Sequence, residues 1–533
     1  MDELVRGAEG DVTGHELRPA GAMTALKTAS DRSTYVVALS SIAAIGGFLF
    51  GFDSGVVNGT VDALALAFGT RAATTGFAVA SVLLGCAAGA FVAGTIADRH
   101  GRRPTMLATA VLFLGSAAAT GLAGSAGFFI ASRFAGGLAI GAASVLAPMY
   151  ISEVAPSRER GRLASLQQMA IVLGLFSAFL SNDIIVRIAG GAGATLWGGL
   201  PAWRWMFWME AFPSAAFLAG VLLIPESPRF LVASGKRKQA LDVFARIGGD
   251  ADALVLQVEQ SLRGEHRPRF SDLIVRGTRR LAPVLWIGMG LAAFQQFVGI
   301  NIIFYYGEVL WKAVGATEQW ALRINLLTGL VNILATIPAI ALVDRAGRKP
   351  LLLVGSAGMA VTLAVMAILF GTSGIGASGK PLLTHGSAVI GLVAANLYIV
   401  AFAVSWGPVM WVLLGEMFPN RMRGAALAVS GATNWVANFA VTEGSSRALS
   451  SGNALIRQRD AATLAAPRSG AFGSRASRTG IDSISPEKRP LSQKASRKMR
   501  LASFLRILGP IPPPMTTPET ARDLSARLPA SAP

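Results

Sequence analysis

Ionisable side chains inside apolar stretches are the residues of this chain with the clearest capacity for chemistry. Asp53 lies in the apolar stretch from Tyr35 to Val57, and Arg133 opens a later, glycine-rich stretch. A charged side chain in hydrocarbon costs free energy, so such residues face the protein interior, have a partner and mark functional sites. We predict that Asp53 and Arg133 pair while the carboxylate is ionised and separate when it is protonated. A static structural ion pair is the alternative interpretation.

Amide side chains form a second set inside apolar stretches. Gln295, Gln296 and Asn301 fall close together, and Gln168 lies in an earlier stretch. Amides are expected to face the interior of a helical bundle, where their donors and acceptors suit sugar hydroxyl groups. The alternative is that they join helices to each other, as Asn and Gln do in membrane bundles.

Two tryptophans complete the candidate binding residues. Trp406 precedes Gly407 and Pro408, a pair that bends a helix and frees backbone groups beside a cavity. Its indole could stack on the apolar face of a pyranose ring, whereas an interfacial anchor is the alternative. The same two alternatives apply to Trp435, which is next to Asn434.

Composition indicates what must hold these residues in place. Hydrophobic residues make up 52% of the chain and charged residues 15%, against about a quarter charged in soluble domains. Stretches such as 35–57, 72–97, 104–123 and 281–309 can each cross a hydrocarbon core, which needs about 20 helical residues. The sequence therefore predicts an all-α polytopic membrane protein.

The net charge of +18 does not indicate nucleic-acid binding, because of where the charges lie. Basic residues crowd into alternate short loops and into the C-terminal tail, and cytoplasmic loops are the ones that retain Lys and Arg. We predict a multi-pass protein of the cytoplasmic (inner) membrane with a cytoplasmic N-terminus. Its expected partners are the lipid bilayer, a substrate and protons, with no nucleic acid.

Enzyme chemistry is not indicated. Cys86 is the only cysteine and lies in an apolar stretch, and the four histidines fall in tails or loops. No metal-ligand cluster, activated nucleophile or phosphate-binding loop is recognisable. We therefore predict no catalytic residue, no metal and no cofactor.

Apolar and polar segments alternate in a way that predicts six spans, a linker and five spans. We expect a cytoplasmic N-terminal tail (1–33), an N-terminal transmembrane bundle (34–224), a cytoplasmic linker of short helices (225–280), a C-terminal bundle of five spans (281–442) and a basic tail (443–533).

A repeated loop relates the two groups of spans. The segment from Asp98 to Arg103 follows the second span of the first group, and the segment from Asp344 to Lys349 follows the second span of the other. Parallel repeats of this kind form two bundles related by an axis along the membrane normal, with a substrate site between them near mid-membrane.

Six motifs occur in a fixed order along the chain. They are GGFLFGFD (46–53), RF (133–134), PMYISE (148–153), PESPR (225–229), FQQFVGIN (294–301) and SWGP with EMFP (405–408 and 416–419). With these motifs the chain resembles the sugar porter family of the major facilitator superfamily, from about residue 35 to residue 438. The resemblance implies the major facilitator fold and transport of a monosaccharide, with proton symport by alternating access.

The resemblance also implies roles for particular residues. An acid at the position of Asp53 is associated with proton symport and an amide with uniport, so Asp53 and Arg133 are the expected coupling pair. The expected substrate-binding residues are Gln168, Gln295, Gln296, Asn301, Trp406, Asn434 and Trp435. Pentose, hexose and polyol carriers share these amides, so the sugar stays open.

Charged residues at the cytoplasmic helix ends form a gating set. They are Asp98, Arg102, Glu153, Arg160 and Glu226 in one half, with Asp344, Arg348, Glu416 and Arg423 in the other. The resemblance implies ion pairs between the halves that latch the outward-facing state and break when the inside opens, as in a rigid-body rocking switch.

The chain departs from the family pattern in two places before its tail. Leu175 stands where some bacterial members carry a second glutamine seven residues after Gln168, and Phe52 replaces the commoner tyrosine before the acid.

The tail from 443 to 533 has 15 basic and 6 acidic residues and no long apolar run, so the twelfth span is expected to be missing. A reading-frame change shortly after Val441 is one explanation, and a genuine tail with an amphipathic helix from Met499 to Leu508 is another. A non-transporting sugar sensor and an inactive frameshifted remnant therefore stay open beside a working transporter.

Overall fold

The computed structural model describes residues 19–156, 159–248, 250–264, 270–275, 280–375, 381–382 and 384–465. Residues 1–468 form one compact unit, and 469–533 form a second that lies outside the described residues. The predicted tail, its amphipathic helix and the expected absence of a twelfth span therefore fall largely outside the described part of the chain.

Helices dominate the described residues. The first half of the structure contains α1 (Pro19–Asn58), α2 (Val61–Phe68), α3 (Ala72–His100), α4 (Arg102–Leu122), α5 (Ala126–Val154), α6 (Arg160–Ala189), η1 (Trp197–Gly199), α7 (Ala202–Trp208) and α8 (Ala211–Leu223). A connecting segment contains α9 (Pro228–Ala233), α10 (Arg237–Ile247), α11 (Ala251–Gly264) and η2 (Phe270–Leu273).

The second half contains α12 (Pro283–Phe297), α13 (Ile300–Ala313), α14 (Glu318–Ala346), α15 (Arg348–Thr372), α16 (His385–Val404), α17 (Trp406–Met417) and α18 (Asn420–Ala465). Two short strands, β1 (Gly374–Ile375) and β2 (Pro381–Leu382), pair antiparallel between α15 and α16.

Ten helical segments among the described residues are long and apolar enough to cross a membrane. Three of them consist of paired helices, which are α7 with α8, α12 with α13, and α16 with α17. The prediction of an all-α polytopic membrane protein is confirmed. The eleventh expected span lies within α18, whose interior carries several polar side chains and which is not among these ten.

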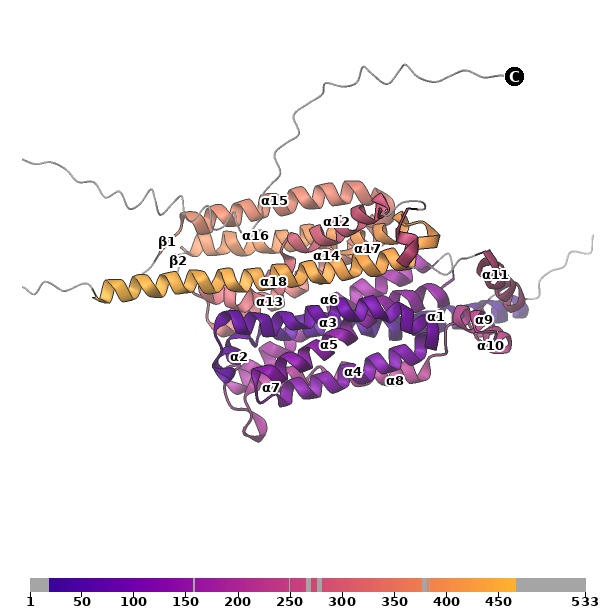
Figure 1. Ribbon diagram of the computed structural model, residues 1–533, viewed down its shortest axis with the longest axis horizontal. Helices are drawn as coiled ribbons and strands as arrows, with labels where there is room; N and C mark the ends of the chain where they lie inside the picture. The colour runs from indigo at the N-terminus through magenta and orange to yellow at the C-terminus, as the bar shows by residue number, and fades with distance from the viewer. Residues whose placement is uncertain are drawn as a thin grey trace, which may run out of the picture. The chain divides into compact units, whose positions relative to one another are not determined.

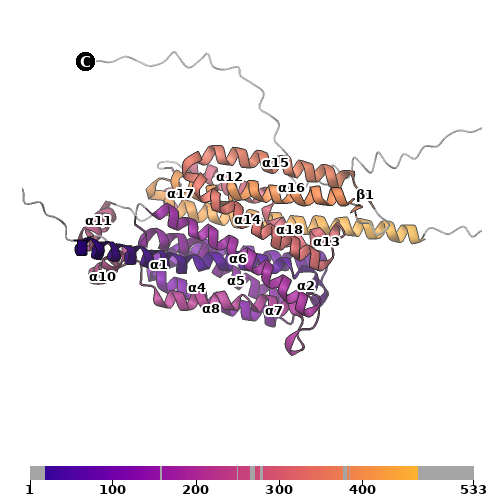
Figure 2. The same ribbon diagram turned by 180° about the vertical axis from the view of Figure 1, so that it is seen from behind.

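The two halves lie side by side with their helices roughly aligned (Figures 1 and 2). Helices α9, α10 and α11 gather at one end, which we call the linker end. Helices α2 and α7 lie at the opposite end, which we call the far end. Helix α18 of the second half packs along α3 of the first, and α14 packs on α6.

Helix α18 continues well beyond residue 442, where the sequence analysis places the end of the last span. It ends at Ala465, and Glu443, Ser445 and Ser446 are buried in it. An added Cβ on Gly76 of α3 would overlap Ser446, so these residues fit closely against the first half. The segment directly after Val441 therefore packs as part of the structure, which does not favour a frame change at that point.

Two spans of the second half are broken near their middle. Gly299 has φ +85°, a left-handed conformation that favours glycine, and it separates α12 from α13. Ser405 (φ −125°, ψ −89°) separates α16 from α17. Breaks at membrane depth are tolerated where other groups satisfy the freed backbone, and here the Tyr398 hydroxyl donates to the Val298 carbonyl at 2.6 Å.

Helices α3 and α5 approach closely because small residues face each other. Gly85 and Gly89 are four residues apart on α3, and an added Cβ at either would overlap the backbone of α5. Gly137 and Gly141 of α5 have the same relation to α3. This is the small-residue packing by which membrane helices associate without a hydrophobic driving force. It fixes the position of Arg133, which lies one turn before Gly137 on α5.

We expect Gly137→Val to destabilise the protein, because the added side chain must overlap the backbone of α3. Overpacking of this kind costs about 1–3 kcal/mol, which would lower the melting temperature in detergent. Gly115→Val is the matched control, since no atom of another residue lies near the position of its Cβ. Equal melting temperatures for the two variants would contradict the packing described here.

Candidate functional site

Asp53 of α1 and Arg133 of α5 form an ion pair inside the first half. Each guanidinium Nη donates to one carboxylate oxygen, with Nη2 and Oδ2 at 2.9 Å. Asp53 is 3% exposed and Arg133 2%. The Arg133 guanidinium also lies over the ring of Phe207, 5.5 Å from its centre. The structure thus brings together the two residues that the sequence analysis pairs, in a bidentate geometry.

A second buried acid, Glu210, accompanies this pair. It lies between α7 and α8, is 3% exposed and interacts electrostatically with both Asp53 and Arg133. The sequence analysis did not select it. Glu210 is an acid inside an apolar span, so the rule that selected Asp53 could also have found it.

An amide network occupies the breaks in the second half. Gln296 donates from Nε2 to Asn434 Oδ1 at 3.1 Å, and Asn301 donates from Nδ2 to Gln296 Oε1 at 2.6 Å. Asn434 donates to Gln295 Oε1 at 2.9 Å and to the Ala292 carbonyl at 2.8 Å. Residues of α12, α13 and α18 therefore meet in one hydrogen-bonded cluster.

Trp406 joins this network through its backbone. Gln295 donates from Nε2 to the Trp406 carbonyl at 2.8 Å, and the Trp406 indole N–H donates to Ser356 Oγ of α15 at 2.8 Å. Gln168 of α6 approaches from the other half, with its amide nitrogen 3.8 Å from where a Cβ on Gly407 would lie. Gln295 and Gln168, one from each half, thus both lie close to the α16–α17 break.

Trp435 lies on the same helix as Asn434 but in a different setting. Its ring meets Phe50 of α1 edge to face, with ring centres 5.1 Å apart. It is buried, and its indole nitrogen has no hydrogen-bond partner among the described residues. Packing between the halves accounts for these contacts.

The predicted gating residues form pairs at the linker end, each within one half. Arg102 Nη2 lies 2.9 Å from Glu153 Oε1 and 3.1 Å from Asp98 Oδ1, and Arg348 Nη2 lies 2.7 Å from Glu416 Oε1. The side chains of Arg160 and Asp344 lie outside the described set.

Backbone groups satisfy two further members of the gating set. Glu226 accepts from the backbone N–H of Arg102 at 2.9 Å, and Arg423 Nε donates to the Phe418 carbonyl at 3.2 Å. The resemblance implies pairs between the halves instead. Among the described residues, the hydrogen bonds seen between the halves, such as that of Asn58 to the Phe304 carbonyl, lie toward the far end instead.

Asn58, at the end of α1, is the centre of the contacts between the halves. It donates to the Phe304 carbonyl at 2.8 Å, and its Oδ1 accepts from Asn325 Nδ2 at 2.7 Å and from the Glu308 backbone N–H at 3.1 Å. One turn earlier, Ser54 Oγ lies 3.5 Å from the Tyr305 hydroxyl. Helix α1, which carries Asp53, is therefore tied directly to α13 and α14.

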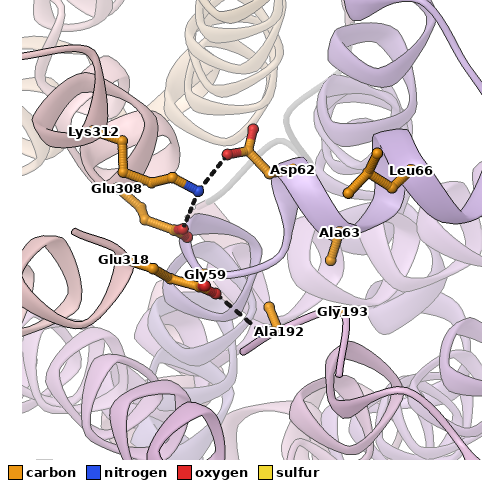
Figure 3. A pocket seen from close by; sticks show the side chains of 9 residues that line it. All are labelled: Gly59, Asp62, Ala63, Leu66, Ala192, Gly193, Glu308, Lys312 and Glu318. Atoms are coloured by element: carbon orange, nitrogen blue, oxygen red, sulfur yellow. Dashed lines mark hydrogen bonds and ion pairs between the residues drawn. The ribbon is translucent and has the colours of Figure 1, made fainter. Parts of the chain in front are cut away.

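Lys312 of α13 links the halves through charge at the far end (Figure 3). Its Nζ lies 2.7 Å from Asp62 Oδ2 of α2 and 3.3 Å from Glu308 Oε1 on its own helix. Glu318 of α14 accepts from the backbone N–H of Ala192 at 2.9 Å. This cluster was not predicted from the sequence, because its members lie at or near span ends, where single charges are common.

A profile of the family described as "Sugar (and other) transporter" matches residues 39–455. The chain belongs to this sugar transporter family. The match extends beyond residue 438, where the motifs alone end the resemblance, and it includes the first part of α18 that follows Val441. Assignment to the sugar porters of the major facilitator superfamily is confirmed.

Relatives within the sugar transporter family include two bacterial proteins. A glucose transport protein of Synechocystis sp. is 51% identical over 410 residues, 76% of this chain and 87% of the relative. The D-xylose-proton symporter of Escherichia coli strain K12 is 37% identical over 439 residues, 77% of this chain and 85% of the relative.

Solved structures of one sugar transporter share the fold. The partially occluded inward-open conformation of the xylose transporter XylE from E. coli matches with a TM-score of 0.64 at 34% identity, covering 77% of this chain and 92% of that one. The proton:xylose symporter XylE bound to 6-bromo-6-deoxy-D-glucose matches with a TM-score of 0.67 at 36% identity, covering 77% and 88%.

We expect Lys312→Gln to favour opening of the far end, because it removes the cation shared by Asp62 and Glu308. The ratio of open to closed molecules should rise roughly two- to fivefold, the scale of a partly exposed ion pair. Pulsed electron spin resonance between labels at Leu66→Cys and Thr372→Cys would measure this opening. Cys86, the only native cysteine, is buried and would be replaced by Ala.

Arg323→Gln is the control for this experiment, since Arg323 stacks on Trp320 of its own helix. A double variant with Asp62→Asn should open no further than Lys312→Gln alone if the two charges act on each other. Unchanged distance distributions in Lys312→Gln would contradict the role of this ion pair.

Proposed function

We propose that this chain carries out secondary active transport of a monosaccharide, coupled to proton symport by alternating access between two halves. The observation that carries the proposal is the buried Asp53–Arg133 pair on α1 and α5. A separate hydrogen-bonded cluster of amides beside Trp406, approached by Gln168 from the other half, supports it. Relatives named as a glucose transport protein, a D-xylose-proton symporter and an arabinose-proton symporter support a monosaccharide as substrate.

Proton coupling rests on the geometry of α1. Protonation of Asp53 removes the charge that holds the Arg133 guanidinium, so α1 is no longer fixed against α5 by a charge-assisted pair. Ser54 and Asn58 of the same helix contact α13 and α14 of the second half. A change at Asp53 therefore reaches the contacts that close the far end, and Glu210 adds a second carboxylate within electrostatic range.

Sugar binding is assigned to the convergent amides. Gln295, Gln296, Asn301 and Asn434 already bond to one another and to backbone groups. A sugar hydroxyl would replace some of these hydrogen bonds, because the amide donors already have acceptors. The net free energy gained per hydrogen bond to the sugar is therefore modest. Gln168 supplies an amide from the other half, and Trp406 supplies an aromatic face.

We also propose a gating role for the charges at the linker end. With the far end closed by contacts between the halves, the described linker-end pairs lie within one half. We infer that they exchange for pairs between the halves when the protein opens outward. The linker end is assigned to the cytoplasm and the protein to the cytoplasmic (inner) membrane, because basic residues crowd at that end.

Uptake of labelled sugar separates this proposal from its rivals. In cells or proteoliposomes with an inward proton gradient, a symporter accumulates sugar and loses that accumulation when a protonophore is added. A sugar sensor would bind sugar without any uptake, and an inactive remnant would do neither. Uphill uptake that survives the protonophore would overturn proton symport.

We expect Asp53→Asn to retain sugar counterflow and to lose accumulation against a gradient. The amide mimics the protonated acid, so the change of access stays possible while its link to protons is lost. Asp183→Asn is the matched control, since Asp183 is also a buried acid of the first half but pairs with Arg187 one turn away on α6. Undiminished uphill uptake by Asp53→Asn would contradict the coupling assignment.

We expect Gln295→Ala to weaken sugar binding by roughly 0.5–1.5 kcal/mol, which is one lost hydrogen bond to a neutral partner. The half-saturating concentration in counterflow should rise about two- to tenfold. Gln319→Ala, at an exposed amide on α14, should leave it unchanged. An unaltered half-saturating concentration in Gln295→Ala would place the sugar elsewhere.

A further inference from the structure

The indole N–H of Trp406 has a dedicated acceptor outside the amide network. It donates to Ser356 Oγ at 2.8 Å, and Ser356 lies on α15, a helix that supplies no other candidate binding residue. An indole has one N–H and no acceptor, so this bond commits its whole polar capacity. In this arrangement Trp406 offers a sugar only the faces and edges of its ring.

We infer that Ser356 is a positioning residue that fixes the ring plane of Trp406 for stacking on the sugar. The inference rests on the proposed function, in which Trp406 forms part of the sugar site. It assigns to α15 a part in recognition, whereas the predicted binding residues lie on α6, α12, α13, α17 and α18.

The backbone around Trp406 is held on both sides. Gln295 donates to the Trp406 carbonyl at 2.8 Å, and the preceding Ser405 donates from its hydroxyl to the Ala401 carbonyl at 2.6 Å. What these bonds leave free is rotation of the side chain about its own two torsions. The bond to Ser356 restrains that remaining rotation.

Close helix packing brings Ser356 within reach. An added Cβ on Gly355, its neighbour in sequence, would overlap the side chain of Ser405, so α15 approaches the α16–α17 break closely. The contact between α15 and the break therefore fixes where the hydroxyl of Ser356 lies. A serine supplies an acceptor there, whereas an alanine of nearly the same size would not.

Fixing the ring before the sugar arrives lowers the entropy lost on binding. An unrestrained aromatic side chain must be ordered when the sugar stacks on it, and that ordering weakens binding. Loss of the Ser356 hydroxyl should therefore raise the half-saturating sugar concentration roughly two- to tenfold. Maximal exchange rate and proton coupling should stay close to those of the parent protein, because Asp53 and Arg133 are untouched.

The test compares Ser356→Ala, Ser356→Thr and Trp406→Phe in sugar counterflow by the full-length protein. Ser356→Ala should raise the half-saturating concentration, and Ser356→Thr, which keeps the hydroxyl, should restore it. Ser373→Ala is the control, since that hydroxyl near the far end of α15 donates to the Phe370 carbonyl. Because phenylalanine lacks the N–H, adding Ser356→Ala to Trp406→Phe should weaken binding no further.

Two results would overturn the inference. One is an unchanged half-saturating concentration in Ser356→Ala, whether or not the melting temperature falls. Ser356 would then have a structural role only. The other is full additivity of Ser356→Ala with Trp406→Phe. Failure of the proposed site itself is distinguishable, because Trp406→Ala would then also leave the half-saturating concentration unchanged.

Discussion

The buried pair of Asp53 and Arg133 is the constraint on which the rest of the structure depends. Two opposite charges with 3% and 2% exposure lie inside a helical bundle, where a single unpaired charge would be costly. Removing one partner of such a pair costs about 3–5 kcal/mol, so neither residue is free to move alone while both are charged. The small-residue contact of α5 with α3 holds Arg133 in place. Because Asp53 pairs with Arg133, the position of α1 is fixed as well.

Helix α1 turns this local constraint into one that spans both halves. Within two turns it carries Asp53, the proposed coupling acid, and the residues that meet α13 and α14, notably Asn58. The second half contains broken helices. Their free backbone groups form hydrogen bonds with residues that are proposed to bind the sugar. Gln295, for example, donates to the carbonyl of Trp406. In the proposed function the same amides have a binding role and a structural role, so sugar binding would be linked to helix geometry.

The sequence predicts part of this site because membrane-buried polarity is rare. Asp53, Arg133 and the amides stand out within apolar stretches. The structure pairs Asp53 with Arg133 and joins Gln295, Gln296, Asn301 and Asn434 in a separate cluster. Glu210 was accessible to the same reasoning, since it too is an acid in an apolar span. Ser356 could not be selected from the sequence, because serine is common in membrane helices. Its proposed role depends on its hydrogen bond with Trp406, which only the structure shows.

Pairings that depend on conformation could not be predicted from the sequence. Arg102 and Arg348 were predicted to pair between the halves, whereas the structure pairs them with Glu153 and Glu416 of their own half. The pairing of Lys312 with Asp62 at the far end could not be predicted from the sequence either. The extent of α18 was underestimated because the polar composition after residue 442 resembles a loop, whereas burial of Glu443 and Ser446 against the first half stabilises a helix there.

Direct measurement of proton movement upon sugar addition tests the central claim most sharply. Proteoliposomes in weakly buffered medium, without an imposed gradient, would receive sugar outside while external pH is recorded. Proton symport through Asp53 predicts transient alkalinisation of the medium that depends on sugar, disappears with a protonophore and is absent from Asp53→Asn. Sugar entry by the parent protein without any change in external pH would show uncoupled transport and contradict the role given to the Asp53–Arg133 pair.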